Sequence, residues 1–290
     1  MEKDYDLIIA HDPFTLQTSL QLSKKNNTPV LHDAHEYTPL QFEHNLLHRF
    51  LNYIWDYICK KYMRCVQATI TVNQGIADKY KVNYGTECEI INNAPFFHEL
   101  KPSPTDPNKI RMVYHGVAHS SRHTENMIYL MNHLDERFHL DLLLLNDGSR
   151  YYKRILELGV NNPRISFPEP VPMPELPRVL NKYDIGLYLL MPTSFNTFMA
   201  LPNKIFEFIQ ARLAIAVWPS PEIARIANEY SCGLVSDDFT LEPMSKKLNA
   251  LTADDISKFK TNAALAAQEL CAERNREMFL NIVGRLISKD

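Results

Sequence analysis

The chain has 290 residues, enough for one large domain or two ordinary ones, and 45 % of them are apolar, as in a globular protein with a core. Its 31 basic and 34 acidic residues give a net charge of −3, which argues against a general nucleic-acid binder. Only 8 glycines are present, and none forms a Walker or dinucleotide phosphate loop. The 5 cysteines lack metal-binding spacing and indicate reduced thiols in a cytosolic protein. No apolar run approaches the ~20 residues that span a bilayer, and no signal peptide is expected.

Apolar runs and helical segments alternate through the first 95 residues. Such alternation implies a parallel sheet with right-handed crossovers. Three or four strands make only part of an open sheet. We therefore expect residues 1–95 to form a partial Rossmann-like domain. Either another chain supplies the missing strands, or the protein works without them, or it is inactive. The predicted strands are 6–13, 29–37, 68–73 and 88–95, and the predicted helices are 14–25, 43–66 and 74–80.

Residues 95–109 contain four prolines and four charged residues. Proline removes backbone donors and stiffens the chain. We interpret residues 96–109 as an interdomain linker.

Residues 110–290 repeat the alternation with enough strands for a complete open sheet. In such sheets, ligands bind outside the carboxyl ends of the strands. Three helical stretches end the chain, and the last, 272–288, either stays here or returns to the first domain. The predicted strands are 110–116, 140–147, 164–170, 184–190, 214–220 and 232–237, and the helices between them are 123–134, 149–158, 173–181, 203–212 and 221–229.

A helix beginning near Pro202 is a candidate anion site. Its free N–H groups and dipole favour a negative charge by ~0.3–1 kcal/mol when exposed. Lys204 and Glu207 lie on one face of this helix, where a simple surface ion pair is the alternative. In the next helix, Glu222 either caps the helix or faces the crevice, and spacing does not decide between these.

Four segments, in order, resemble retaining GT-B glycosyltransferases of family 4. The run LPNKIFEFIQARLAIAVWPSPEIARIANEYSCGLVS (201–236) is similar to their donor-site region. VYHGVAHSSRH (113–123) resembles the first strand and loop of their nucleotide domain. VLHDAHEYTP (30–39) and the stretch 68–95 resemble segments of their acceptor domain. The resemblance implies two Rossmann-like open parallel-sheet domains, the N-terminal one incomplete.

The resemblance also implies a donor site. Glu207 matches the glutamate that binds the ribose hydroxyls of the donor. Lys204 and the backbone up to Asn203 would face its phosphates. Gly116 would let the backbone pass close, and Arg122 would bind the diphosphate, with a solvated loop arginine as the alternative. The family's other glutamate is replaced by Met199, and Asn196 or Thr197 would substitute for it by hydrogen bonding.

On the acceptor side, the resemblance places polar residues at two strand ends. His35 is the candidate catalytic residue, because a group that titrates near neutrality can handle the proton of an acceptor hydroxyl. The alternatives are that Asp33 or Glu36 caps a helix and that His11 packs under a loop. The acceptor-side residues are His11, Asp12, Asp33 and Glu36.

The leading hypothesis is a cytoplasmic hexosyltransferase of polysaccharide or glycoconjugate biosynthesis. It would transfer a sugar from a UDP- or GDP-linked donor to a saccharide or lipid-linked acceptor, with retention and without a metal or other cofactor. The alternative is a degenerate nucleotide-sugar-binding or scaffolding subunit; a sugar-nucleotide epimerase has no supporting residue. The basic, aromatic helix 43–66 favours core packing, with peripheral contact at the inner face of the membrane as a second possibility. The missing strands allow a homodimer or a partner chain.

Overall fold

The computed structural model describes residues 5–43 and 48–288, which form two compact units. The first unit comprises Met1–Asn93, Pro192–Leu201 and Glu273–Asp290, and the second comprises Ala94–Met191 and Pro202–Ala272. The chain therefore crosses between the units at several points, and the short stretch 192–201 is part of the first unit. Each unit is an α/β structure around one parallel sheet, as predicted.

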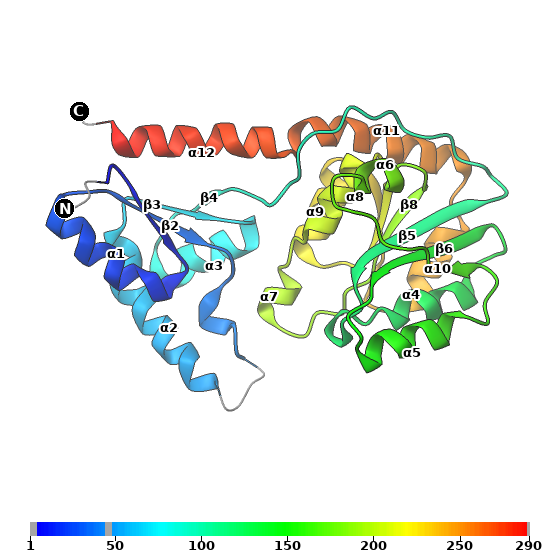
Figure 1. Cartoon of the computed structure of the whole chain (residues 1–290), viewed down its shortest axis with the longest axis horizontal. Coiled ribbons are helices and arrows are strands. Elements are labelled where there is room, and N and C mark those ends of the chain that lie inside the picture. Colours follow the sequence, from blue (N-terminus) through cyan, green and yellow to red (C-terminus); the bar gives the residue numbers. More distant parts are fainter. Residues whose placement is uncertain (1–4, 44–47, 289–290) are drawn as a thin grey trace. The chain divides into compact units, whose positions relative to one another are not determined.

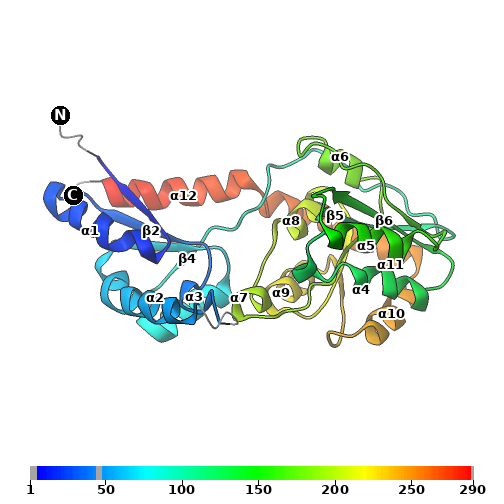
Figure 2. The same ribbon diagram turned by 60° about the horizontal axis from the view of Figure 1, so that its bottom comes forward.

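The first unit contains a four-stranded parallel sheet in the order β1-β2-β3-β4. Helices α1, α2 and α3 cover one face, where Leu16, Cys59 and Tyr80 pack with Ala10 and other strand residues. Helix α12 covers the opposite face, as Figures 1 and 2 show. The elements are β1 (Ile8–His11), α1 (Pro13–Asn26), β2 (Val30–Ala34), the 3-10 turn η1 (Thr38–Leu40), α2 (Arg49–Tyr62), η2 (Met63–Cys65), β3 (Ala68–Thr71), α3 (Gln74–Tyr84), β4 (Glu89–Ile90), α7 (Phe195–Phe198) and α12 (Ala272–Ile287).

The second unit contains a six-stranded parallel sheet in the order β10-β9-β8-β5-β6-β7. The order reverses at β5, which has β8 on one side and β6 on the other. This is the switch point where ligands bind in open α/β sheets. The elements are β5 (Ile110–Val117), η3 (Ser120–Arg122), α4 (Glu125–Leu130), η4 (Met131–His133), β6 (Phe138–Leu145), α5 (Arg150–Gly159), β7 (Ile165–Ser166), α6 (Leu176–Leu180), β8 (Ile185–Tyr188), α8 (Asn203–Gln210), β9 (Ala214–Val217), α9 (Pro221–Glu229), β10 (Gly233–Val235), α10 (Leu241–Asn249) and α11 (Ala253–Glu269).

The proline-rich stretch 96–109 is not a free linker. Arg212, with only 1 % of its surface exposed, donates to the carbonyl oxygens of His98 and, at 3.2 Å, Leu100. The backbone N–H of His98 donates to the side chain of Gln210 at 3.1 Å. These bonds fasten the stretch to the second unit, to which it belongs.

Several predicted elements differ in length from the observed ones. The predicted helix 43–66 contains α2 and η2, and its residues 44–47 lie outside the described part of the chain. The predicted strand 164–170 is reduced to Ile165–Ser166, because Pro168 and Pro170 cannot donate to a ladder. Helix α7 was not predicted; it starts with a capping box in which Ser194 and Thr197 bond each other's backbone.

Among the described residues, none of the helices has the length and apolar character needed to cross a bilayer. Helix α2 packs against the core of the first unit through Cys59 and Ile58, in line with the preference for core packing, and it also leaves large side chains exposed. Phe50, Tyr53 and Tyr57 are each more than half exposed, and in α2 only Cys59 is buried.

Candidate functional site

The end of β5 approaches the start of α8 closely at Gly116. The φ angle of Gly116 is +117°, a conformation that favours glycine. A Cβ atom here would lie 2.8 Å from Cε and 2.9 Å from Nζ of Lys204. The absent side chain therefore leaves the space in which the Lys204 ammonium lies.

Two cations occupy this strand end. Lys204 lies in the first turn of α8, and its ammonium is 5.7 Å from the centre of the Tyr114 ring. Burial, and secondly repulsion by Arg122, lower the pKa of Lys204 below its ordinary value, while Glu207 acts in the opposite direction. Arg122 donates to the hydroxyl of Tyr188 at 3.3 Å. Within residues 5–43 and 48–288, neither cation forms an ion pair, so the site carries positive charge that an anion would neutralise.

Glu207 lies close to a buried histidine. Its side chain is 9 % exposed, and its Oε2 lies 3.1 Å from Nε2 of His115, which is 8 % exposed. The ring of His115 also meets the ring of Phe208 edge-on, with centroids 5.5 Å apart. The carboxylate of Glu207 is thus buried beside His115 and near enough to Lys204 to act on its pKa.

An apolar cavity adjoins Gly116. Its volume is about 260 Å³. Apolar side chains from β6 and from the segment after β7 form most of its wall. This wall suits the flat ring of a base, while the cations suit phosphate. The lining includes His115, Gly116, Leu143, Pro170, Pro172 and Met173.

The other predicted donor residues lie elsewhere. Asn203 is exposed at the start of α8. Asn196 belongs to the first unit, where its amide accepts from the backbone of Tyr37 at 2.9 Å and donates to it at 3.2 Å. Thr197 accepts in the capping box of α7, and Met199 packs against the apolar core of the first unit. The side chains of Asn196 and Thr197 are thus already engaged within the first unit.

Glu222 is oriented by a neighbouring arginine. It is buried in the first turn of α9, and its Oε2 accepts from Arg225 at 3.0 Å. From the sequence, Glu222 was expected either to cap the helix or to face the crevice. Its ion pair with Arg225, three residues further on, was not predicted.

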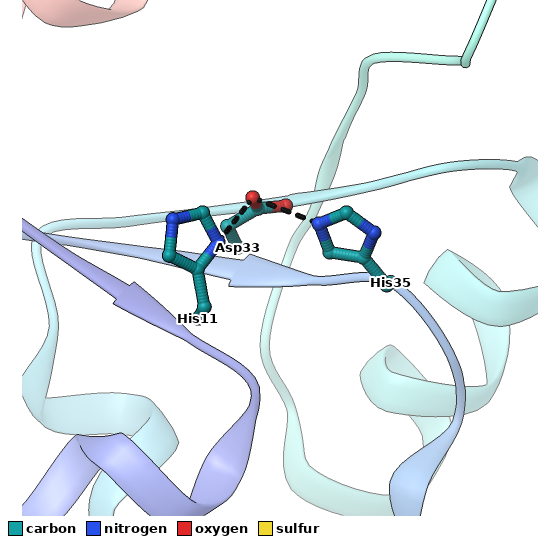
Figure 3. A group of neighbouring side chains, drawn as sticks. All are labelled: His11, Asp33 and His35. Carbon is teal, nitrogen blue, oxygen red and sulfur yellow. Dashed lines mark hydrogen bonds and ion pairs between the residues drawn. The ribbon is translucent and has the colours of Figure 1, made fainter.

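In the first unit, the structure brings three of the predicted acceptor-side residues together. Nδ1 of His11 lies 2.8 Å, and Nε2 of His35 3.1 Å, from the same oxygen, Oδ2 of Asp33. Figure 3 shows the two rings on either side of the carboxylate. His11 is 62 % exposed at its side chain, so it does not pack under a loop, and Asp33 pairs with histidines instead of capping a helix. His, Asp and His are also residue types that could hold a metal ion, although no metal site was predicted.

Asp12 and Glu36 adjoin this cluster. Oδ1 of Asp12 accepts from the backbone N–H of His35 at 3.3 Å. Asp12 precedes α1 but makes no side-chain cap for it. Burial and the nearby charge of Asp12 raise the pKa of Glu36, while His35 opposes the shift. Three carboxyl groups and two histidines therefore gather at the ends of β1 and β2.

Sequence reasoning missed His115 and Tyr188. Both lie in buried apolar strands, where a histidine or tyrosine looks like ordinary core. One signal was present: His115 immediately precedes Gly116, at the end of the strand where ligands of open sheets bind.

Many solved structures are similar to most of the chain, among them the following three. HepE of Anabaena, crystallised with UDP, is 14 % identical with a TM-score of 0.74, and the match covers 97 % of this chain and 79 % of HepE. Sucrose-phosphate synthase of Thermosynechococcus elongatus is 11 % identical with a TM-score of 0.72, over 97 % of this chain and 74 % of the synthase. WaaG, a glycosyltransferase involved in lipopolysaccharide biosynthesis, is 12 % identical with a TM-score of 0.61, over 89 % and 80 % of the two chains.

These similarities define the fold. The chain has the α/β fold with two parallel sheets that GT-B glycosyltransferases share. No known protein family matches the sequence, and no curated protein does.

Proposed function

We propose that this protein is a glycosyltransferase that uses a nucleotide-sugar donor. The observation that carries the proposal is the pair of cations, Lys204 and Arg122, beside Gly116 and an apolar cavity. A nucleoside diphosphate has the matching chemistry, since it joins a flat ring to two phosphates. HepE, with the same fold, was crystallised with UDP.

In this proposal, the second unit binds the donor. The base enters the apolar cavity, and Lys204, Arg122 and the first N–H groups of α8 bind the diphosphate. Glu207, fixed 3.1 Å from His115, accepts hydrogen bonds from the ribose hydroxyls. The same cations stabilise the negative charge that develops on the diphosphate as the bond to the sugar breaks. Catalysis then rests on positioning and electrostatics.

The first unit supplies the acceptor side. His35 receives the proton of the acceptor hydroxyl, and the Asp33 carboxylate 3.1 Å from it holds the ring and stabilises its charged form. His11, Asp12 and Glu36 would contact the acceptor. We further propose the retaining, family 4 type of reaction, a UDP- or GDP-linked hexose, and a role in polysaccharide or glycoconjugate assembly. The similarity of the fold to WaaG supports that role.

The exposed face of α2 favours peripheral attachment to the inner face of a membrane. Phe50, Tyr53 and Tyr57 are exposed beside the basic residues Lys60 and Lys61. Aromatic and basic groups on one amphipathic helix bind anionic lipid surfaces. Co-sedimentation with vesicles that contain anionic lipid tests this; binding that survives Phe50→Ser with Tyr53→Ser would contradict it.

A second candidate function is a nucleotide-sugar-binding or scaffolding subunit without activity of its own. It is favoured by Met199, which packs in the apolar core, and by Asn196 and Thr197, whose side chains bond within the first unit. None of these three side chains would then be available to contact the donor sugar.

Calorimetry with UDP and GDP, followed by detection of transfer or donor hydrolysis, tests both functions. We expect one diphosphate to bind, and Lys204→Met with Arg122→Met to abolish its binding. If neither diphosphate binds the wild-type chain, the proposal is wrong. Binding without turnover, under conditions that supply a range of acceptors, would support the subunit.

A further inference from the structure

The ends of β1 and β2 carry three side chains whose donor atoms converge. Nδ1 of His11 and Nε2 of His35 lie 2.8 and 3.1 Å from Oδ2 of Asp33, and the three atoms lie within 4.8 Å of one another. Ligands of a tetrahedral zinc ion, at ~2.0–2.1 Å from the metal, lie about 3.3 Å apart. The observed separations are therefore close to those of a metal-ligand set.

The strand pairing fixes this arrangement. His11 and Asp33 are partners in the parallel register of β1 and β2, so their side chains stand next to each other on one face of the sheet. His35 follows two residues after Asp33, in the bend just beyond the end of β2. The register of β1 and β2 thus brings His11 to Asp33, and the bend after β2 adds His35.

The turn at Asp12 holds His35 in place. Asp12 has φ 55° and ψ 164°, a backbone conformation that is strained for a residue other than glycine. Its carboxylate accepts the N–H of His35 at 3.3 Å instead of capping α1. The carboxylates of Asp12 and Asp33 also add negative charge at the same strand ends, which favours a dication.

We propose that His11, Asp33 and His35 form a binding site for a transition-metal dication, with Zn²⁺ as its preferred ion. Two imidazoles and one carboxylate suit Zn²⁺ and related ions, whereas Mg²⁺ and Ca²⁺ prefer oxygen ligands alone. The side chains of His11 and His35 are 62 % and 51 % exposed. Solvent can therefore reach the site and supply the remaining ligand.

Zn²⁺ at this site would have a consequence for the proposed function, on which this part of the inference rests. It would bind Nε2 of His35, the nitrogen that faces Asp33, and so replace the contact that is proposed to hold the ring and stabilise its charged form. Zn²⁺ is therefore expected to inhibit transfer while leaving the affinity for UDP in the second unit unchanged.

The test is titration of the nucleotide-free full chain with Zn²⁺ by calorimetry and with Co²⁺ by visible absorption. We expect one tight Zn²⁺ site and the intense bands of four-coordinate Co²⁺. Changes outside the ligand shell alone weaken metal binding by about 10–100-fold. His11→Ala and His35→Ala should therefore each weaken Zn²⁺ binding at least 10-fold and abolish the Co²⁺ bands. Because both side chains are more than half exposed, these variants should fold, which circular dichroism checks.

His123→Asn is the matched control. His123 lies 3.7 Å from the carboxylate of Glu125, so it forms a histidine–carboxylate pair without a second histidine. This variant should keep the full Zn²⁺ affinity. The proposal is overturned if the double variant of His11 and His35 binds Zn²⁺ as tightly as the wild type, or if His123→Asn loses as much affinity. UDP calorimetry is a separate measurement, so failure of the metal site and failure of the donor site are distinguishable.

Discussion

Replacing Gly116 with alanine perturbs the proposed donor site through one added methyl group. That carbon would lie 2.8 Å from Cε and 2.9 Å from Nζ of Lys204. Both atoms belong to the far end of a flexible side chain, so the lysine moves and the backbone does not. The ammonium would then leave the position from which it is proposed to bind the diphosphate.

The size of the effect follows from the lost contact. A hydrogen bond to a charged group contributes about 1.5–3 kcal/mol, and 1.36 kcal/mol corresponds to a factor of ten. The Kd for UDP should therefore rise roughly 10- to 150-fold in Gly116→Ala. The φ of +117° adds a separate cost in stability, on the order of 1–3 kcal/mol, because residues with a Cβ avoid this conformation.

A second glycine separates these two costs. Gly148 also has a positive φ, +71°, but no atom lies within 4 Å of a Cβ built there. Gly148→Ala should lower stability to unfolding by urea and leave the calorimetric Kd for UDP unchanged. In a Lys204→Met background, Gly116→Ala should weaken UDP binding little further. The reasoning is refuted if Gly148→Ala weakens UDP binding as much, or if the effects of the Gly116 and Lys204 variants add in full.

Three other predictions concern the second unit. Glu207→Gln should reduce the preference for UDP over 2′-deoxy-UDP in calorimetry, and an unchanged preference would argue against a ribose contact. Lys260→Met should lower the free energy of unfolding in urea by about 1.5–3 kcal/mol, because the buried Asp184 loses its charged partner at 3.1 Å and keeps only Arg111, at 3.4 Å; a loss below ~0.5 kcal/mol would contradict this. Burial lowers the pKa of Lys204. As the pH rises, Lys204 should therefore lose its charge, and the protein its affinity for UDP, at a lower pH than an ordinary lysine would. Lys204→Arg should remove this fall in UDP affinity, since a guanidinium stays charged. If the variant and the wild type have the same pH profile, Lys204 is not the source of the fall.

The fold was predictable where apolar runs and turn residues agree. Both parallel sheets follow from the alternation of apolar strands with helical segments. For the proline-rich stretch 96–109, composition shows only that it is poor in backbone donors, and not which residues its carbonyl groups bond. Its carbonyl groups accept hydrogen bonds from Arg212, more than a hundred residues further along the chain. No local sequence pattern shows that this arginine is buried and bonds to them. Helix α7 was not predicted because its four residues are too few to show the helical period of apolar residues.

The site was predictable only in part. Gly116, Arg122, Lys204 and Glu207 came from a resemblance, and the structure brings them to one strand end. His115 was missed, since a buried strand offers no local reason to single out one polar residue. The roles of other candidate residues depend on contacts that the sequence does not show. Asn196 is an example, because its amide bonds the backbone of Tyr37.

The two strand-end sites have opposite electrostatic character, and each lies within one unit. In the second unit, Lys204 is desolvated and repelled by Arg122, so part of the binding free energy of an anion is relief of that repulsion. In the first unit, the carboxylate of Asp33 attracts two histidines, and a dication would replace their shared protons. This difference in sign is the reason that we propose a diphosphate at one sheet edge and a metal at the other. It also means that Lys204→Met should leave Zn²⁺ affinity unchanged and His35→Ala should leave UDP affinity unchanged, so each site can be titrated while the other is disabled.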